Sequence, residues 1–238
     1  MMGVRMEKQV KSKQRVADHG EVFTAEREVK AMCDLVRNET EQISARFLEP
    51  ACGDGNFLAE ILTRKLQCSE MQRYRKSPYD WERNSLLCIG SLYGVDIQLD
   101  NVLICRERLF DIWNKAYKKI CKKECYDETR VAARFILKKN IICGNALTYR
   151  RVDENGKETG EPIVFSEWSF LSGKTSGSGS PIIHWKDYSF DELVNGTQGA
   201  SNIQEGEPKL FDPKEEPKDE GKFIGEDSRH YRRFGNNE

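Results

Sequence analysis

The sequence predicts an α/β protein built around a parallel sheet. Three short apolar segments, at residues 47–49, 92–97 and 140–147, each lead into glycine or polar residues. Stretches with helical spacing separate them, and this alternation of strands and helices is typical of parallel sheets. Because the carboxyl ends of parallel strands meet at one edge of a sheet, we expect the polar strand ends to line one crevice.

The turn after the first strand, within residues 47–58, is the most informative segment. Gly53 and Gly55 stand there with one residue between them, and an apolar, helix-like stretch follows. Glycines allow positive φ angles and a close approach of the backbone to a ligand. The free N–H groups of the helix start then point at that ligand. The segment therefore predicts a small cofactor at the carboxyl end of the strand.

The residues of this turn indicate which cofactor it binds. A dinucleotide loop needs a third glycine where Leu58 stands, and no phosphate loop of the G-x-x-x-x-G-K-[ST] kind occurs. The acids Glu49 and Asp54 would repel a pyrophosphate, but they suit an ammonium group and ribose hydroxyls. We therefore expect S-adenosyl-L-methionine (SAM). An ordinary strand-to-helix turn also fits two glycines, so the prediction depends on the segments that follow.

Two further strand ends favour the same interpretation. The second strand ends in Asp96, at the position where an acid of a βαβ unit hydrogen-bonds a ribose. The third strand ends in a polar turn at Asn145. Upstream, residues 19–24 lead into a helical pattern at residues 25–36.

In this order, over about residues 19–147, the four segments resemble the N6-adenine DNA methyltransferases of restriction–modification systems, of the gamma class. The resemblance implies a Rossmann-like sheet of the SAM-dependent methyltransferase type. It also implies that residues 19–24 pack over the methionine end of SAM and that Glu49 lies near its ammonium group. One departure is Ala25, which stands where the family usually has a proline.

The resemblance assigns the adenosine end of SAM to the later segments. The acid matching Asp96 holds the ribose hydroxyls, Ile97 packs on the adenine, and Asn145 contacts the adenine amino group. The full set of implied cofactor-binding residues is Phe23, Thr24, Glu49, Pro50, Ala51, Gly53, Gly55, Phe57, Asp96, Ile97, Asn145 and Ala146.

The catalytic segment of that family, Asn/Asp/Ser-Pro-Pro-Tyr/Phe, is absent from the 238 residues. In the family it accepts the hydrogens of the adenine amino group and stacks on the flipped-out base. Residues 77–80 match it only in part, with a single proline, and they precede the second strand. We therefore assign no catalytic residue and expect a sheet truncated after its third strand.

Such a truncation leaves the first strand at the edge of the sheet, with a ladder that folded proteins normally cover or pair. Either residues 151–194 cover this edge, or a partner protein supplies the missing strands and the catalytic loop. The main hypothesis is a DNA methyltransferase, or its cofactor-binding subunit, with double-stranded DNA as a further partner. A non-catalytic SAM- or DNA-binding remnant is the alternative. Methylation of RNA or protein uses the same cofactor fold, although the motif order argues against it.

Four regions are expected along the chain. Residues 1–45 form a mostly helical segment, 46–150 the SAM-binding α/β domain, 151–194 a strand-and-turn extension, and 195–238 an acidic, disordered tail. Within the extension, His184 and Trp185 lie on a strand-like segment, and we expect a packed aromatic surface there rather than a catalytic histidine.

The composition predicts a cytoplasmic protein without a membrane segment. Charged residues make up 32% of the chain and the mean hydropathy is −0.70, so part of the chain lies outside a core. No apolar run reaches membrane-spanning length, and no signal peptide is recognisable. The 8 cysteines include no C-x-x-C pair, and Cys121 and Cys125 lack further ligands nearby. We expect reduced thiols and no metal.

Besides the basic residues at 5–15, two basic clusters stand out against a net charge of −1. They consist of Arg64, Lys65, Arg73, Arg75 and Lys76 in one case, and of Lys115, Lys118, Lys119, Lys122 and Lys123 in the other. Clusters of this kind contact phosphates in nucleic-acid-binding proteins. They are also typical of solvated helix faces and of helix C-termini, where cations are favoured by the helix dipole, and the lysine cluster fits this interpretation better. The sequence leaves both interpretations open.

Overall fold

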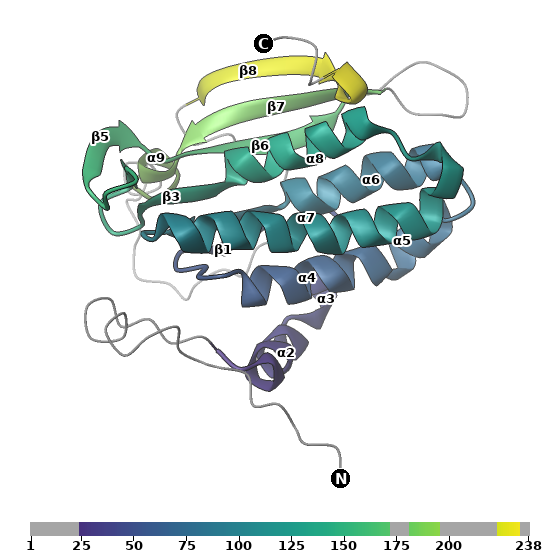
Figure 1. Ribbon diagram of the computed structural model, residues 1–238, viewed down its shortest axis with the longest axis horizontal. Helices are drawn as coiled ribbons and strands as arrows, with labels where there is room; N and C mark the ends of the chain where they lie inside the picture. The colour runs from purple at the N-terminus through teal and green to yellow at the C-terminus, as the bar shows by residue number, and fades with distance from the viewer. Residues whose placement is uncertain (1–23, 172–180, 196–222, 234–238) are drawn as a thin grey trace, which may run out of the picture.

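The computed structural model describes residues 24–171, 181–195 and 223–233, which form two sheets and a layer of helices (Figure 1). Phe23, residues 172–180 and most of the predicted acidic tail lie outside the described residues. The helices are α2 (Glu26–Leu35), α3 (Arg37–Thr40), α4 (Asn56–Gln67), α5 (Ser69–Tyr74), α6 (Pro78–Gly90), α7 (Leu99–Cys121), α8 (Asp127–Asn140) and α9 (Phe190–Asn195), with 3-10 turns η1 (Lys122–Glu124) and η3 (Tyr231–Arg233).

The larger sheet has the strand order β1-β2-β3-β4-β5. Its strands are β1 (Phe47–Glu49), β2 (Leu92–Asp96), β3 (Ile141–Asn145), β4 (Arg150–Val152) and β5 (Glu158–Pro162). The first three are parallel, as the sequence predicts, and β1 lies at the edge. The protein is thus a mixed α/β protein.

The larger sheet differs from the expectation at its other edge. It continues past β3, because the chain reverses near Tyr149, which adopts a positive φ of 59°. This reversal lets β4 and β5 pair antiparallel beside β3. Strand β4 spans the boundary that we expected at residue 150, so the sheet includes residues that the sequence assigned to a separate extension.

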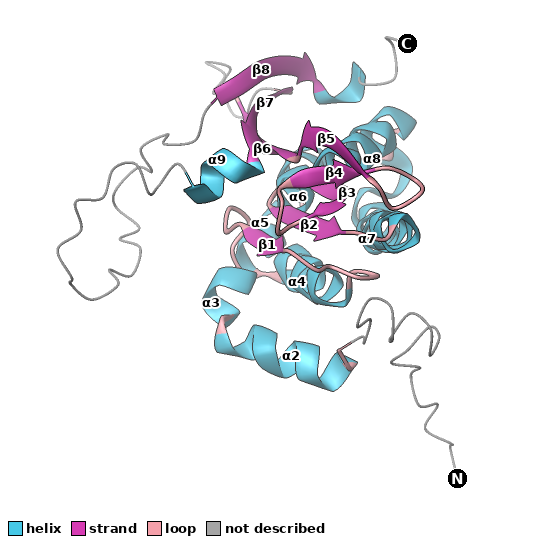
Figure 2. Ribbon diagram, turned by 90° about the vertical axis from the view of Figure 1, so that its left-hand side faces the viewer, coloured by secondary structure: helices cyan, strands magenta, loops and turns pink. Residues whose placement is uncertain are grey.

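The smaller sheet consists of β6 (Val164–Phe170), β7 (Ile182–Ser189) and β8 (Phe223–His230), all antiparallel. Figure 2 shows it curving over the larger sheet. The ring centroid of Phe165 on β6 lies 5.3 Å from that of Tyr93 on β2. Buried Asn140 donates to the carbonyls of Gly90 and Ser166 and accepts from the Ser166 N–H. Residues 163–170 therefore cover a face of the larger sheet, but they do not pair with the edge of β1.

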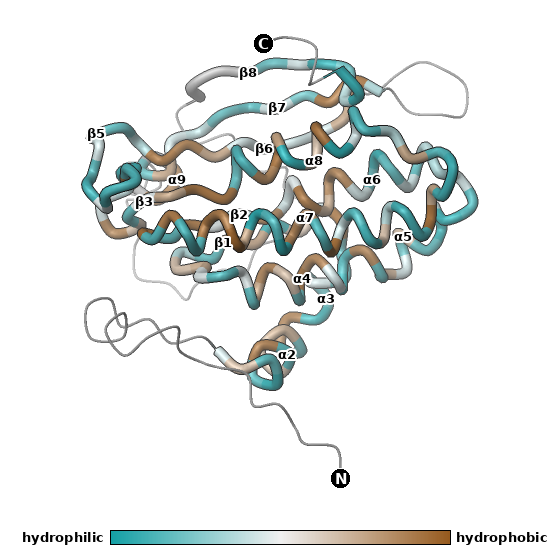
Figure 3. Tube along the Cα trace, in the orientation of Figure 1, coloured by the Kyte–Doolittle hydropathy of each residue, from teal (hydrophilic) through white to brown (hydrophobic). Residues whose placement is uncertain are grey.

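The long helices enclose an aromatic core. The rings of Trp113 and Tyr117 on α7 stack at 4.8 Å, with Trp81 of α6 stacked beyond them. Figure 3 shows that most of β3 is hydrophobic, whereas β5 is hydrophilic. Trp185 is also buried in this core, 5.2 Å from the ring of Trp168, so the predicted aromatic packing on that strand is confirmed for Trp185.

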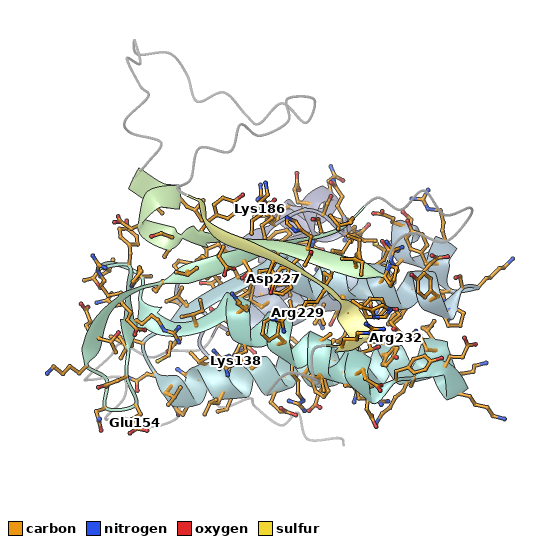
Figure 4. The ribbon with its side chains drawn as sticks, turned by 90° about the horizontal axis from the view of Figure 1, so that it is seen from above. Lys138, Glu154, Lys186, Asp227, Arg229 and Arg232 are labelled. Carbon is orange, nitrogen blue, oxygen red and sulfur yellow. The ribbon has the colours of Figure 1, made fainter. Side chains whose placement is uncertain are left out.

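The C-terminal turn of the described chain is anchored to this core. Arg232, labelled in Figure 4 at the end of β8, donates from Nε to Glu82 on α6 at 2.9 Å. Glu82 is fully buried and also accepts from the hydroxyls of Tyr117 and Thr129. Because a buried carboxylate needs such donors, this network attaches the smaller sheet to the helices.

Part of the first basic cluster is internal. Lys65 is fully buried, and its ammonium group donates to the carbonyls of Gln42, Ile43 and Ala45 at 2.6, 3.2 and 2.6 Å. These carbonyls belong to the loop that leads into β1. Lys65 therefore stabilises the loop that precedes β1 and cannot contact an external phosphate.

Each of the eight cysteines is a free thiol. Over residues 24–171, 181–195 and 223–233, no group of three or more His, Cys, Asp or Glu side chains is arranged to hold a metal ion. The helices formed by these residues include none with the length and apolar character needed to cross a membrane.

Candidate functional site

A cavity of about 520 Å³ lies where the carboxyl ends of the three parallel strands meet. Its wall is built from the ends of these strands, the loop after β1 and the starts of α4 and α7: Thr24, Glu49, Pro50, Ala51, Cys52, Gly53, Asp54, Asn56, Phe57, Asp96, Ile97, Gln98, Asn101, Gly144, Asn145, Ala146 and Leu147. We call it the strand-end pocket. Its volume falls in the usual range for small-molecule sites.

The loop after β1 holds its shape through glycine geometry and backbone hydrogen bonds. Gly53 has φ 52° and Gly55 has φ 88°, values that a residue with a side chain rarely adopts. A Cβ at Gly55 would also stand 2.6 Å from the Cys105 sulfur. The Cys52 N–H donates to the carbonyl of Val95 at 2.9 Å, which ties the loop to β2. The loop thus leaves the N-terminus of α4 open toward the pocket.

Asp96, at the end of β2, is hydrogen-bonded to the loop after β1. One carboxylate oxygen accepts from the Gly53 N–H at 2.9 Å. The other accepts from the Gln98 N–H at 2.8 Å and from the Asn101 amide at 3.3 Å. A carboxylate offers about four acceptor positions, so about one remains for a ligand hydroxyl. Asp96 therefore organises the loop as well as facing the pocket.

Glu49 supplies a second negative charge at the end of β1. Burial raises the pKa of its carboxyl above the ordinary value, and a hydrogen bond from the Ala51 backbone opposes this rise in part. Neither Glu49 nor Asp96 forms an ion pair with a described residue, whereas Asp54 lies 3.3 Å from the Arg108 guanidinium. The wall contains no basic residue. The pocket is therefore suited to a ligand that carries positive charge and hydroxyl groups.

Asn145 is held by its own turn and by a neighbouring hairpin. Its side-chain oxygen accepts from the Leu147 N–H at 3.0 Å. Its amide group donates to Glu158 of β5 at 2.8 Å, and the Thr148 hydroxyl donates to the same Glu158 oxygen at 2.8 Å. The polar atoms of Asn145 are thus engaged within the protein, so contact with a ligand would require an exchange of partners.

A chain of contacts connects α7 to the segment before α2. Arg108 donates to the side-chain oxygen of Asn56 at 2.6 Å, and the Asn56 amide donates to the carbonyl of Thr24 at 3.3 Å. Thr24 is thereby held against the rim of the pocket. The same guanidinium neutralises Asp54, which leaves Glu49 and Asp96 as the unneutralised acids of the wall.

The structure brings together the site residues that the sequence predicted. Every predicted residue that it describes lines the pocket except Gly55, which lies buried behind the wall. Phe23 is outside the described residues. Ile97 is 41% exposed and offers an apolar surface at the rim. Whether these residues bind SAM stays a prediction.

Sequence reasoning missed several residues around the site. Gln98 and Asn101 follow Asp96 at the start of a helix, which is a position where polar residues often satisfy free backbone groups, and this was a usable signal. No sequence signal points to Arg108 or Glu158. Arg108 reaches the site only through the packing of α7, and Glu158 only through the β4–β5 hairpin.

Fold and site define a mixed α/β protein with an acidic pocket at the ends of three parallel strands. Comparisons of the chain with protein-family models, with curated proteins and with solved structures find no match.

Proposed function

We propose that the strand-end pocket binds SAM and that the chain is the cofactor-binding part of an adenine-N6 DNA methyltransferase of the restriction–modification type. The observation that carries the proposal is the pair of unneutralised acids, Glu49 and Asp96, on either side of a glycine loop. SAM carries a sulfonium, an ammonium group and a ribose diol. Glu49 would pair with the ammonium group, and Asp96 would accept from a ribose hydroxyl.

The backbone supports the same assignment. The N-terminus of α4 opens at Asn56, so its free N–H groups suit the carboxylate of SAM. The order of three parallel strands, joined by helices, supports a Rossmann-like sheet of the methyltransferase type. Ile97 would provide the apolar contact for the adenine.

The proposal includes a partner protein that supplies the catalytic Pro-Pro-aromatic loop and base recognition, and double-stranded DNA as substrate. Among the described strands, β1 pairs only with β2, and Leu48 in its middle is 46% exposed. In a parallel pair, successive residues of an edge strand direct their backbone N–H and C=O groups alternately toward the partner strand and away from it. The Phe47 N–H bonds to the carbonyl of Ser91, on the β2 side, so the backbone groups of Leu48 point away from β2. The backbone of Leu48 is therefore available to a strand from a partner. Free thiols agree with action in the cytoplasm.

The alternative is a SAM- or DNA-binding protein without chemistry of its own. The absence of the catalytic tetrapeptide from the sequence favours it as much as it favours a split enzyme. The two differ in whether a partner restores methyl transfer.

The test measures SAM binding by isothermal titration calorimetry, and then transfer of a labelled methyl group to unmethylated duplex DNA. We expect SAM binding by the chain alone and no transfer until a partner carrying the missing loop is added. Absence of SAM binding would reject the proposal. Methyl transfer by the chain alone would reject the need for a partner.

A further inference from the structure

A second cavity, of about 630 Å³, lies at the opposite end of α7 from the strand-end pocket. It runs between the C-terminal half of α7 on one side and the end of α4 with α5 on the other. Figure 1 shows these helix ends together near α5, away from the β3 end of α7. We call this cavity the basic groove.

The charged residues that line the basic groove are all cations. They are Arg75, Lys115 and Lys119, and none forms an ion pair within the described part of the chain. The Arg75 guanidinium donates to the side chain of Gln72, at 2.8 Å. By contrast, Arg108 and Arg134 of the neighbouring surfaces are paired with acids. The groove thus combines one residue of the first basic cluster, Arg75, with two residues of the second, Lys115 and Lys119.

The helix dipole does not account for all of these cations. Its effect is confined to the last turn of a helix. Lys115 lies more than one turn before the end of α7 at Cys121. Neither the helix dipole nor an ion pair within the described residues therefore accounts for Lys115 at the groove.

The floor of the basic groove is apolar. Ile112, Ala116 and Ile120 recur every four residues along α7 and are only partly buried. Buried Leu66 and Trp81 complete the floor. From Ile112 to Ile120 the stripe extends about 12 Å, slightly more than two helical turns. Lys115 and Lys119 stand beside it.

We propose that the basic groove binds an acidic amphipathic helix of a partner protein. An apolar face of such a helix would lie on the stripe, and its flanking carboxylates would pair with Arg75, Lys115 and Lys119, as in other helix-in-groove complexes. Nucleic acid fits less well. Single strands bind by stacking their bases on exposed aromatic rings, but Trp81 in this groove is only 1% exposed. A duplex binds mainly through its charged phosphates, which gain nothing from contact with an apolar floor. The inference does not depend on SAM binding.

The experiment uses the full chain and fluorescence anisotropy. The probe is a fluorescein-labelled synthetic helix of about 18 residues, roughly five turns, with leucines on one face and glutamates beside them. A comparator peptide carries lysine in place of each glutamate. The groove variant combines Arg75→Gln, Lys115→Gln and Lys119→Gln. The matched control combines Lys118→Gln, Lys122→Gln and Lys123→Gln, which removes the same charge from the same end of the molecule but outside the groove.

We expect the acidic peptide to bind at least about tenfold more tightly than the comparator, and the groove variant to lose about tenfold in affinity, as the sum of three exposed ion pairs. The control should stay within about twofold. Ala116→Gln, which leaves the charge unchanged, should also weaken binding because it places a polar group in the floor. Thermal unfolding and SAM titration of each variant separate a loss of the groove from a loss of the fold or of the strand-end pocket.

Three results would overturn the proposal. They are equal binding of the two peptides, equal losses in the groove variant and the control, and tighter binding of a labelled DNA duplex that depends on the same three cations. The last result would assign the groove to nucleic acid instead. If the groove variant does not fold, Lys115→Gln alone provides the same comparison.

Discussion

The two ends of α7 border two cavities that differ in how their charges are held. At its N-terminal end, Asp96 receives three hydrogen bonds from the surrounding protein, and its position is set before any ligand arrives. At its C-terminal end, Lys115 and Lys119 have no ion-pair partner in the described residues and stand on long side chains. Charges held in place cost less to order around a small ligand. Cations without ion-pair partners above an apolar floor suit a larger ligand, such as a folded helix, that brings its own ordered carboxylates.

The largest effect on stability should come from Lys65, the buried cation that is fixed by hydrogen bonds. Lys65→Met leaves the carbonyls of Gln42, Ile43 and Ala45 without donors, so we expect a loss of about 3 kcal/mol in the free energy of unfolding. Lys119→Met, at the exposed groove, should change it by less than about 0.5 kcal/mol. Urea denaturation of both variants measures the difference. Equal losses of unfolding free energy in the two variants would mean that buried Lys65 contributes no more to stability than exposed Lys119.

The second effect tests the held acid of the strand-end pocket. Asp96→Ala should weaken SAM binding by about 1–3 kcal/mol, because a ribose contact and the bonds that shape the loop are lost together. Asp96→Asn keeps one acceptor oxygen and should lose less. Calorimetric titration of the three proteins gives the affinities. Unchanged affinity in Asp96→Ala would refute the assignment of Asp96 to the ribose.

The third effect concerns Glu49 and pH. Burial raises the pKa of its carboxyl in the free protein, whereas a bound ammonium group would favour the charged form and lower that pKa. SAM affinity should therefore fall as the pH drops, starting above the range in which an ordinary glutamate titrates. Glu49→Gln should bind about tenfold more weakly at neutral pH, and should lose this part of the pH dependence.

The same shift has a consequence for stability without ligand. Because folded Glu49 binds its proton more tightly than unfolded Glu49, stability should decline as the pH rises between the unfolded and the folded pKa. Glu49→Gln should flatten the unfolding free energy over that window. An unaltered pH profile in this variant would show that another group titrates there.

The last comparison separates the two cavities by how strongly salt weakens ligand binding in each. An increase in ionic strength from about 0.05 to 0.5 M should weaken the acidic peptide at the basic groove by about tenfold, since the ion pairs there are exposed. SAM in the strand-end pocket should lose less than about threefold, because partly buried pairs are screened less. Equal salt dependence would remove the distinction between the two cavities.

The features that the sequence predicted correctly are local ones. The turn with Gly53 and Gly55 and the strand that ends at Asp96 each carry a pattern within a few residues. Strand pairing beyond β3 was not predicted, because β4 depends on the chain reversal at Tyr149, where no glycine signals a positive φ. The roles of Arg108 and Glu158 required contacts across 52 and 13 residues of sequence.

By itself, the sequence determined the parallel strands, the glycine loop and the acids at the strand ends, because period, turn chemistry and charge are written in neighbouring residues. Only the tertiary structure decided which charges are free. Lys65 and Arg75 belong to one basic cluster in the sequence, yet one is buried against three carbonyls and the other lines an open groove. Burial depends on how distant helices pack, and a charge can reach a ligand only where that packing leaves it unpaired.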